Sequence, residues 1–135
     1  MSGAAQAGAA GMSRRAFAVA GLAAAAIVLA PVAPSPGEAL QRCLASLVRD
    51  GESYREVGRL YRLANPALPG TAALRRQIAG AGGGAPLALL RLSVAERRRW
   101  FSGVCRREFA RGDVEPFGGW LFAASELRLA ALLAG

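Results

Sequence analysis

A pair of arginines stands directly in front of an uncharged apolar run near the N-terminus, and this pattern limits how much of the chain can belong to a folded domain. Arg14 and Arg15 precede the segment Ala16 to Ala30, whose 15 residues carry no charge, and the proline-broken stretch PVAPSPGEA follows it. A basic start, a short apolar run and a small-residue end are the regions of an export signal. The run is short for a membrane span, which needs about 20 apolar residues. We predict an export signal; the alternative is a buried alanine-rich helix of the folded domain.

The residues around the arginine pair resemble a twin-arginine (Tat) signal, whose pattern is S-R-R-x-F-L-K. Ser13, Arg14, Arg15 and Phe17 match this pattern, whereas Ala and Val stand in place of its Leu and Lys. The resemblance implies transport by the Tat translocon to the periplasm. Met12 lies directly before the motif and is an alternative start of the chain.

The end of the signal is predicted from its small residues. Cleavage after Ala30 or Ala33 would place a proline at the new N-terminus, which is unfavourable, whereas cleavage after Ala39 leaves small residues at the two positions that the peptidase reads. We predict a cleavable signal over residues 1–39 and a mature domain over residues 40–135. The alternative is an uncleaved segment that tethers the domain to the outer face of the inner membrane, which would be its only membrane contact.

The charge balance is strongly basic. The chain has 17 basic and 9 acidic residues, a net charge of +8, and every basic residue is an arginine. Such an excess can mark a polyanion-binding surface, but no recognition motif accompanies it, so we expect no nucleic-acid partner. An Ala-, Gly- and Arg-rich chain without lysine is also what GC-biased codon usage produces. The absence of histidine excludes Ser-His-Asp and Cys-His catalysis, His-ligated zinc and a histidine ligand to haem.

The periodicity after the signal is helical almost throughout, which predicts an all-α fold, a small bundle of four or five short helices. The expected apolar stripes are Leu40, Cys43, Leu44, Leu47 and Val48; Val57, Leu60, Tyr61 and Ala64; Leu74 and Ile78; Phe101, Val104, Cys105 and Phe109; and Leu127, Leu129, Ala130, Leu132 and Leu133. The fourth helix also carries arginines that form either a solvated face or a docking surface for an acidic partner. They are Arg97, Arg98, Arg99, Arg106, Arg107 and Arg111.

Capping patterns predict the ends of these helices. The expected boundaries are Asp50-Gly51 at the end of the first helix, Ser53 with Glu56 and Asn65-Pro66 around the second, Thr71 at the start of the third, Ser93 with Glu96 and Gly112 around the fourth, and an extended piece over residues 113–117 that leads through Gly118-Gly119 into the last. Gly58 lies inside the second helix at a cost of about 1 kcal/mol relative to alanine, so we expect a neighbouring helix to approach it closely.

A glycine-rich segment separates the third and fourth helices. The stretch GAGGGA, Gly80 to Ala85, formally matches the dinucleotide pattern G-x-G-x-x-G/A. No buried strand precedes it and no helix begins at its end, so we predict a flexible loop. We expect no cofactor in the chain.

The two cysteines, Cys43 and Cys105, lie on the apolar faces of different predicted helices. In an exported chain they suggest one disulfide, which would close a loop of 62 residues. Such a bridge could contribute roughly 4 kcal/mol of stability. The alternative is two buried, unpaired thiols. Two cysteines without a CxxC spacing or histidine are too few for a zinc or iron–sulfur site, so we predict no metal site.

The segment from Asp113 to Leu132 resembles a C-terminal pattern, G-W-x-L-S-x-T-E-x-R, of small twin-arginine-exported proteins of proteobacteria. The matching residues are Gly119, Trp120, Glu126 and Arg128, and the replaced ones are Phe122, Ala123 and Ser125. The stretch VGRLY, Val57 to Tyr61, is similar to a V-G-x-x-Y element of the same proteins. The C-terminal pattern has the form of a helix start with Glu126 at its third position, so we expect its role to be structural, although Ala123 cannot supply a cap oxygen.

Small helical proteins with such a signal also resemble the small subunits of periplasmic flavin-dependent dehydrogenases, such as gluconate 2-dehydrogenase subunit 3. The resemblance implies a non-catalytic accessory subunit that escorts or stabilises a larger, cofactor-containing periplasmic oxidoreductase. The candidate interface residues, each of which could equally belong to the core, are Trp100, Phe117, Trp120 and Phe122. The alternative function is a free-standing envelope protein that binds an anionic ligand or membrane surface through its arginines. No catalytic residues are predicted, because no nucleophile is paired with a base.

Overall fold

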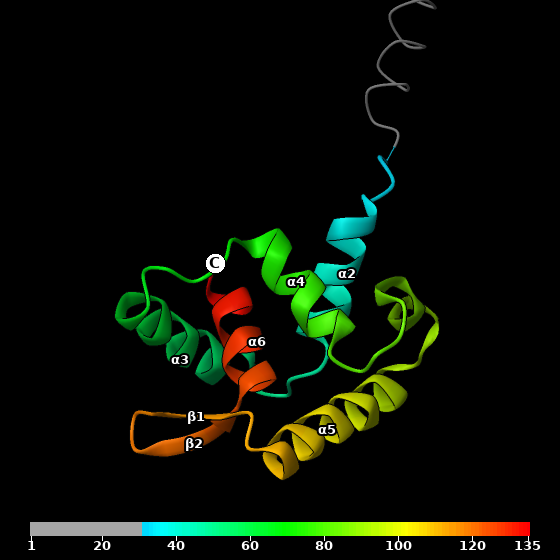
Figure 1. The fold of residues 1–135 in the computed structure, drawn as a ribbon. Helices are drawn as coiled ribbons and strands as arrows, with labels where there is room; N and C mark the ends of the chain where they lie inside the picture. Colours follow the sequence, from blue (N-terminus) through cyan, green and yellow to red (C-terminus); the bar gives the residue numbers. More distant parts are fainter. Residues whose placement is uncertain (1–30) are drawn as a thin grey trace, which may run out of the picture. The chain divides into compact units, whose positions relative to one another are not determined.

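A computed structural model describes residues 31–135 (Figure 1). The chain divides into two units, Met1–Ala33 and Pro34–Gly135, and the second contains all the elements described below. Its elements are α2 (Pro36–Ala45), α3 (Gly51–Ala64), α4 (Thr71–Gly80), the 3-10 helix η1 (Pro86–Arg91), α5 (Val94–Arg111), β1 (Val114–Phe117), β2 (Trp120–Ala123) and α6 (Ala124–Ala134). The predicted small helical bundle is confirmed, with a β-hairpin in addition.

Helix α6 is the centre of this domain. It packs most extensively with α3 and also contacts α4 and α5, and Figure 1 shows it between α3 and α4. Apart from Glu126 and Arg128 near its start, α6 is apolar around most of its surface, so it must be enclosed by its neighbours. Its buried residues are Ser125, Leu127, Leu129, Ala130, Ala131 and Leu132.

Gly58 allows α3 to lie directly against α6. A Cβ atom at position 58 would overlap the backbone carbonyl of Ala130. The predicted close approach of a neighbouring helix at this glycine is therefore confirmed, and the missing side chain is what permits it.

Helix α2 carries the first predicted stripe, but its boundaries differ from the prediction. Leu40, Cys43 and Leu44 are buried, as expected. The helix begins at Pro36, however, and Ser35 caps it. The predicted cleavage position after Ala39 therefore lies inside α2.

Helix α3 starts three residues earlier than the sequence pattern predicts, with Asp50 and not Ser53 as its cap. Asp50 is the N-cap, and its carboxylate accepts the backbone N–H of Ser53 at 3.1 Å, so the capping box expected at Ser53 is wrong. A carboxylate at the N-cap accepts hydrogen bonds from the free N–H groups, and its negative charge interacts favourably with the positive end of the helix dipole. Leu60 and Ala64, expected in the stripe, are exposed, whereas Tyr61 is buried.

Two further boundaries differ from the prediction, the end of the first helix and the start of the third. Helix α2 ends at Ala45 and not at Asp50-Gly51, because Asp50 caps the next helix instead. In the capping box of α5, Ser93 N–H donates to Glu96 Oε2 at 2.7 Å and Glu96 N–H donates to Ser93 Oγ at 3.2 Å. Gly112 ends α5 with a φ of 79°, in the left-handed region that glycine favours. Thr71 is not a cap, because it is the first helical residue of α4 and Gly70 precedes it as N-cap.

The hairpin β1–β2 is an element that the sequence analysis did not predict. Its antiparallel strands pair Phe117 with Trp120 and Pro116 with Leu121. Gly118 and Gly119 form the two-residue loop with φ values of 58° and 81°. Positive φ at both positions is the condition for the tight turn that matches the twist of a hairpin. The Gly-Gly pair between two short runs was the signal that could have revealed it.

The glycine-rich segment forms the predicted loop between α4 and η1. The indole of Trp100 covers Gly82 so closely that a Cβ atom there would overlap it. The absence of a side chain at Gly82 thus allows the loop to pack against Trp100 of α5.

Candidate functional site

The predicted signal residues, Ser13, Arg14, Arg15 and Phe17, lie outside the described residues. The structure therefore bears only on the candidate residues of the helical domain.

The two cysteines are free thiols in the structure and do not form the candidate disulfide. Cys43 is buried in α2 and its Sγ lies 3.7 Å from the carbonyl oxygen of Leu89. Burial raises the pKa of the Cys43 thiol. Burial and the nearby carboxylates of Glu126 and Glu108 raise the pKa of Cys105 to about 12. The two thiols thus have different surroundings, and both are protonated at neutral pH.

Three of the four candidate interface aromatics pack against the core. Trp100 covers the glycine loop, as described above. The ring of Phe117 meets that of Tyr61 edge-on, with centroids 5.3 Å apart. Phe122 lines a small apolar cavity between α3, β2 and α6, of about 140 Å³. These residues hold the fold together, which leaves them little surface for a partner.

Trp120 differs from the other three aromatics. Its side chain is 75 % exposed, and the adjacent Leu121 is 55 % exposed. Both lie at the turn end of the hairpin, and because successive residues of a strand point to opposite faces, each exposes its own apolar side chain. A large exposed aromatic side chain such as that of Trp120 is a common feature of interaction sites.

The arginines fall into distinct groups. Four of them donate to backbone carbonyls, namely Arg62 to Ala131 at 2.6 Å, Arg75 to Gly37 at 2.6 Å, Arg97 to Leu89 at 2.9 Å and Arg98 to Ser46 at 3.1 Å. Arg97 and Arg98 were expected on the solvated face of the fourth helix but are half-buried, because each ties a connecting segment to α5. Part of the arginine excess therefore stabilises the fold through hydrogen bonds to backbone carbonyls.

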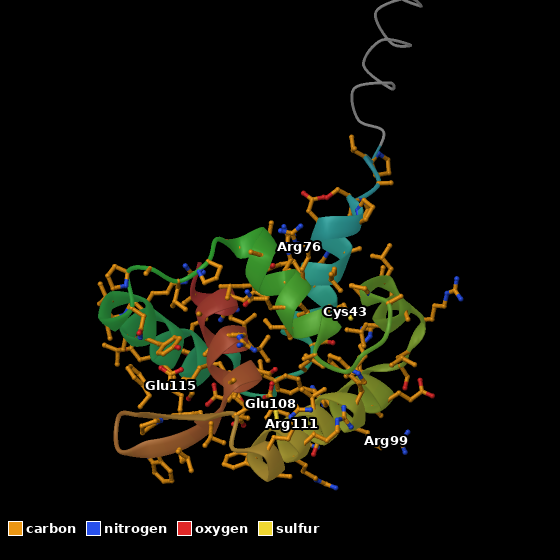
Figure 2. The ribbon with its side chains drawn as sticks, in the orientation of Figure 1. Cys43, Arg76, Arg99, Glu108, Arg111 and Glu115 are labelled. Atoms are coloured by element: carbon orange, nitrogen blue, oxygen red, sulfur yellow. The ribbon has the colours of Figure 1, made fainter. Side chains whose placement is uncertain are left out.

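Three further arginines line one groove, which we call the arginine groove. Arg76 of α4, Arg111 of α5 and Arg128 of α6 contribute to its wall, and its volume is about 760 Å³. Figure 2 labels Arg76 on α4 and Arg111 near the end of α5. Three elements distant in sequence thus bring three guanidinium groups to a single surface.

Each acidic residue of the arginine groove already has a hydrogen-bonding or ion-pair partner. Glu108 accepts two hydrogen bonds from Ser125, at 2.9 and 2.7 Å. Asp113 forms an ion pair with Arg111 at 3.0 Å. Glu115 accepts the hydroxyl of Tyr61 at 2.8 Å. By contrast, neither Arg76 nor Arg128 makes a side-chain hydrogen bond or ion pair with residues 31–135. A guanidinium without a partner offers a planar set of donors that suits carboxylate or phosphate oxygens.

A second cavity, of about 240 Å³, adjoins the arginine groove and shares Arg128 and Glu115 with it. Tyr61 lies in its wall, and burial together with the hydrogen bond to Glu115 raises the pKa of Tyr61 to about 12. The phenol therefore stays protonated at neutral pH and can donate a hydrogen bond but cannot accept a proton as a base.

Comparison with protein-family models, curated proteins and solved structures finds no match. Over residues 31–135, no cluster of three or more potential ligand side chains is placed to hold a metal ion. In that same range, no helix is long and apolar enough to cross a membrane.

No pattern in the sequence indicates that Arg76, Arg128 and Glu108 belong to one surface. Their positions in the chain are far apart, and each has the ordinary appearance of a charged residue on an amphipathic helix. The burial of Glu108 is the one feature that its position in the sequence indicates, because Glu108 continues the helical spacing of the apolar residues Phe101 and Val104.

Proposed function

We propose that this chain is an exported, non-catalytic accessory subunit that binds a larger, cofactor-containing oxidoreductase subunit in the periplasm. The observation that supports this proposal most is the exposure of Trp120, at 75 %. Tryptophan is among the residues most enriched in the energetic centres of protein interfaces, because it buries a large area with few rotatable bonds.

The hairpin presents Trp120 on a fixed support. Its strand β1 is held to α3 through Tyr61, which packs on Phe117 and donates to Glu115. Its strand β2 joins α6 directly, and Phe122 packs against the core. A support that is ordered before binding lowers the entropic cost of association. This favours a role for Trp120 as a preformed contact.

The class of partner follows from the export route. A twin-arginine signal implies transport of folded cargo, and the chain has no evident cofactor ligands of its own. A cofactor-loaded partner that must fold before export would account for the choice of this route. Trp120 is also one of the residues that match the C-terminal pattern of small twin-arginine-exported proteins.

Affinity capture with Trp120→Ala tests the proposal. The C-terminally tagged protein is recovered from the envelope of its native host, washed at moderate salt, and the bound proteins are identified by mass spectrometry. We expect a stoichiometric larger oxidoreductase with the wild-type protein and its loss with Trp120→Ala. The matched control is Leu63→Ala, which removes an apolar side chain of α3 that is 70 % exposed and should retain the partner. Recovery of the folded wild-type protein alone would contradict the proposal.

A second function is favoured by the arginine groove. Arg76 and Arg128 have no partner among residues 31–135, so we propose as the alternative a free-standing envelope protein that binds an anionic ligand there. Titration with inorganic phosphate, followed by NMR of the backbone amides, tests it. We expect shifts around α4 and α6 that disappear in Arg76→Gln/Arg128→Gln and persist in Arg99→Gln/Arg106→Gln, whose side chains are exposed on α5. Binding that fades steeply with salt would mark a surface effect; titration without localised shifts would exclude the groove.

A further inference from the structure

The first turn of α2 is bound into the helical domain. Ser35 N–H donates to Glu38 Oε2 at 2.8 Å, and Glu38 N–H donates to Ser35 Oγ at 3.2 Å. Arg75 of α4 donates to the carbonyl oxygen of Gly37 at 2.6 Å. Leu40 is buried in the core. The backbone on both sides of Ala39 is therefore helical, hydrogen-bonded and partly buried.

This arrangement protects the bond after Ala39 from a peptidase. Proteases cut backbone that can leave its hydrogen bonds and extend into their active site, so a cut here would require the first turn of α2 to unfold. The cut would also remove the capping box, and it would place a positive α-amino group at the positive end of the shortened helix. The bond after Ala39, which has the small residues that the peptidase needs, is thus inaccessible to the peptidase in the folded domain.

The stretch ahead of α2 has the opposite properties. Residues 31–35 are exposed and not helical. Here, however, every small residue after which a peptidase could cut is followed directly by a proline. The three bonds are Ala30-Pro31, Ala33-Pro34 and Ser35-Pro36. A bond to proline is a tertiary amide without an N–H, and the ring restricts the residue before it. The accessible bonds are therefore unsuitable for cleavage.

We infer that the N-terminal signal segment is not removed and that it stays attached to the helical domain after export. The inference rests on the proposed export of a folded chain, because only then is α2 formed before the peptidase meets it. The uncharged run Ala16 to Ala30 then remains as a tether whose partner is the apolar interior of the membrane.

Cell fractionation followed by intact-mass measurement tests the inference on the full chain with a C-terminal tag. We expect the exported protein in the membrane fraction with a mass that begins at Met1 or Met12. An exported chain with any new N-terminus between Ala16 and Leu40 overturns the inference and leaves the proposed export intact. A chain that stays in the cytoplasm of a Tat-competent host overturns the export proposal, and the inference with it.

A double variant, Pro31→Ala/Pro34→Ala, supplies the positive control. It creates an A-x-A site followed by alanine in the exposed stretch, outside α2. We expect cleavage after Ala33 and a shift of the domain from the membrane to the soluble periplasmic fraction. The matched control is Val32→Ala, which changes the same stretch but keeps both prolines and should stay uncut. If the double variant is exported and remains uncut, the prolines are not the cause and the inference is overturned.

Discussion

The carboxylate of Glu108 in α5 accepts both the backbone N–H and the hydroxyl of Ser125 at the start of α6, at 2.9 and 2.7 Å. Glu108 is only 4 % exposed. The residue before α6, Ala123, has no side-chain oxygen to cap the helix, so a carboxylate from another helix takes over part of that role. Glu126 completes the start of α6 by accepting the N–H of Ala123 at 2.8 Å.

Loss of the Glu108 carboxylate should therefore destabilise the domain. We expect Glu108→Ala to lower the free energy of unfolding by about 2–3 kcal/mol, because it leaves the buried N–H and hydroxyl of Ser125 without an acceptor. Glu108→Gln keeps one acceptor and should cost about 1 kcal/mol. Urea unfolding followed by circular dichroism measures both. The exposed neighbour gives the control Arg107→Ala, with a change within about 0.5 kcal/mol; an equal effect of both alanine variants would argue against the cross-helix cap.

Two glycines within helices should respond to alanine in opposite directions. Gly58→Ala forces α3 away from Ala130, and we expect a loss of about 1–3 kcal/mol in the free energy of unfolding. Gly103→Ala in α5 meets only the flexible end of Arg107 at 3.4 Å, so the better helix propensity of alanine should stabilise it by about 0.5–1 kcal/mol. Thermal and urea unfolding compare the two variants. A Gly58→Ala protein as stable as the wild type would mean that α3 and α6 are not in close contact.

The two thiols should be unreactive in the native protein and both countable after unfolding. Burial raises the pKa of Cys43, and burial with nearby carboxylates raises that of Cys105 to about 12, so little thiolate is present at pH 7. We expect negligible labelling by a thiol reagent in the native state and two labelled thiols in denaturant without reductant. No labelling in denaturant would instead reveal a disulfide formed after export.

Stability should fall in acid because carboxylates at helix starts have lowered pKa values in the folded state. The backbone N–H of the capping serine lowers the pKa of Glu38 and Glu96 below 4.5, and the hydroxyl of Ser53 lowers that of Asp50 below 3.8. Groups with a lowered folded pKa contribute stability above their unfolded pKa and lose it as the pH falls through the folded value.

We accordingly expect urea midpoints to be nearly constant from about pH 7 to pH 5 and to decline below about pH 4.5. Glu96→Gln should lower the midpoint at pH 7 and reduce the decline in acid, because it removes one of the titrating groups. A midpoint that increases toward pH 3 would show that these carboxylates do not stabilise the helix starts.

The elements that local chemistry determines could be predicted from the sequence. The capping box of Ser93 with Glu96 and the terminal Gly112 lie within one turn of the helix they bound, so their roles do not depend on the rest of the fold. Gly58 is similar, because a glycine inside a helix is costly unless a neighbour needs the space. The loop at Gly80 to Ala85 was recognised because its context excluded a nucleotide site.

The apolar stripe of α5 shows which residues could not be placed correctly from the sequence. Hydrophobicity placed Phe109 in the core, yet Phe109 is 45 % exposed and Glu108 is buried beside it. The burial of a carboxylate is favourable only because the N-terminus of α6 supplies donors to it. The sequence of α5 alone contains no information about that contact.

The helical class of the domain, both caps of α5, the end of α3 at Asn65 and the close contact at Gly58 could be predicted from the sequence, because they follow from periodicity and from interactions within one or two turns. The tertiary structure alone decided which charged residues meet. Arg76, Arg111 and Arg128 share a groove, Glu108 caps a distant helix, and Trp120 is left in solvent while Phe117 is packed. Each of these outcomes depends on how separate helices are placed against one another, and that placement is set by the packing of the whole core.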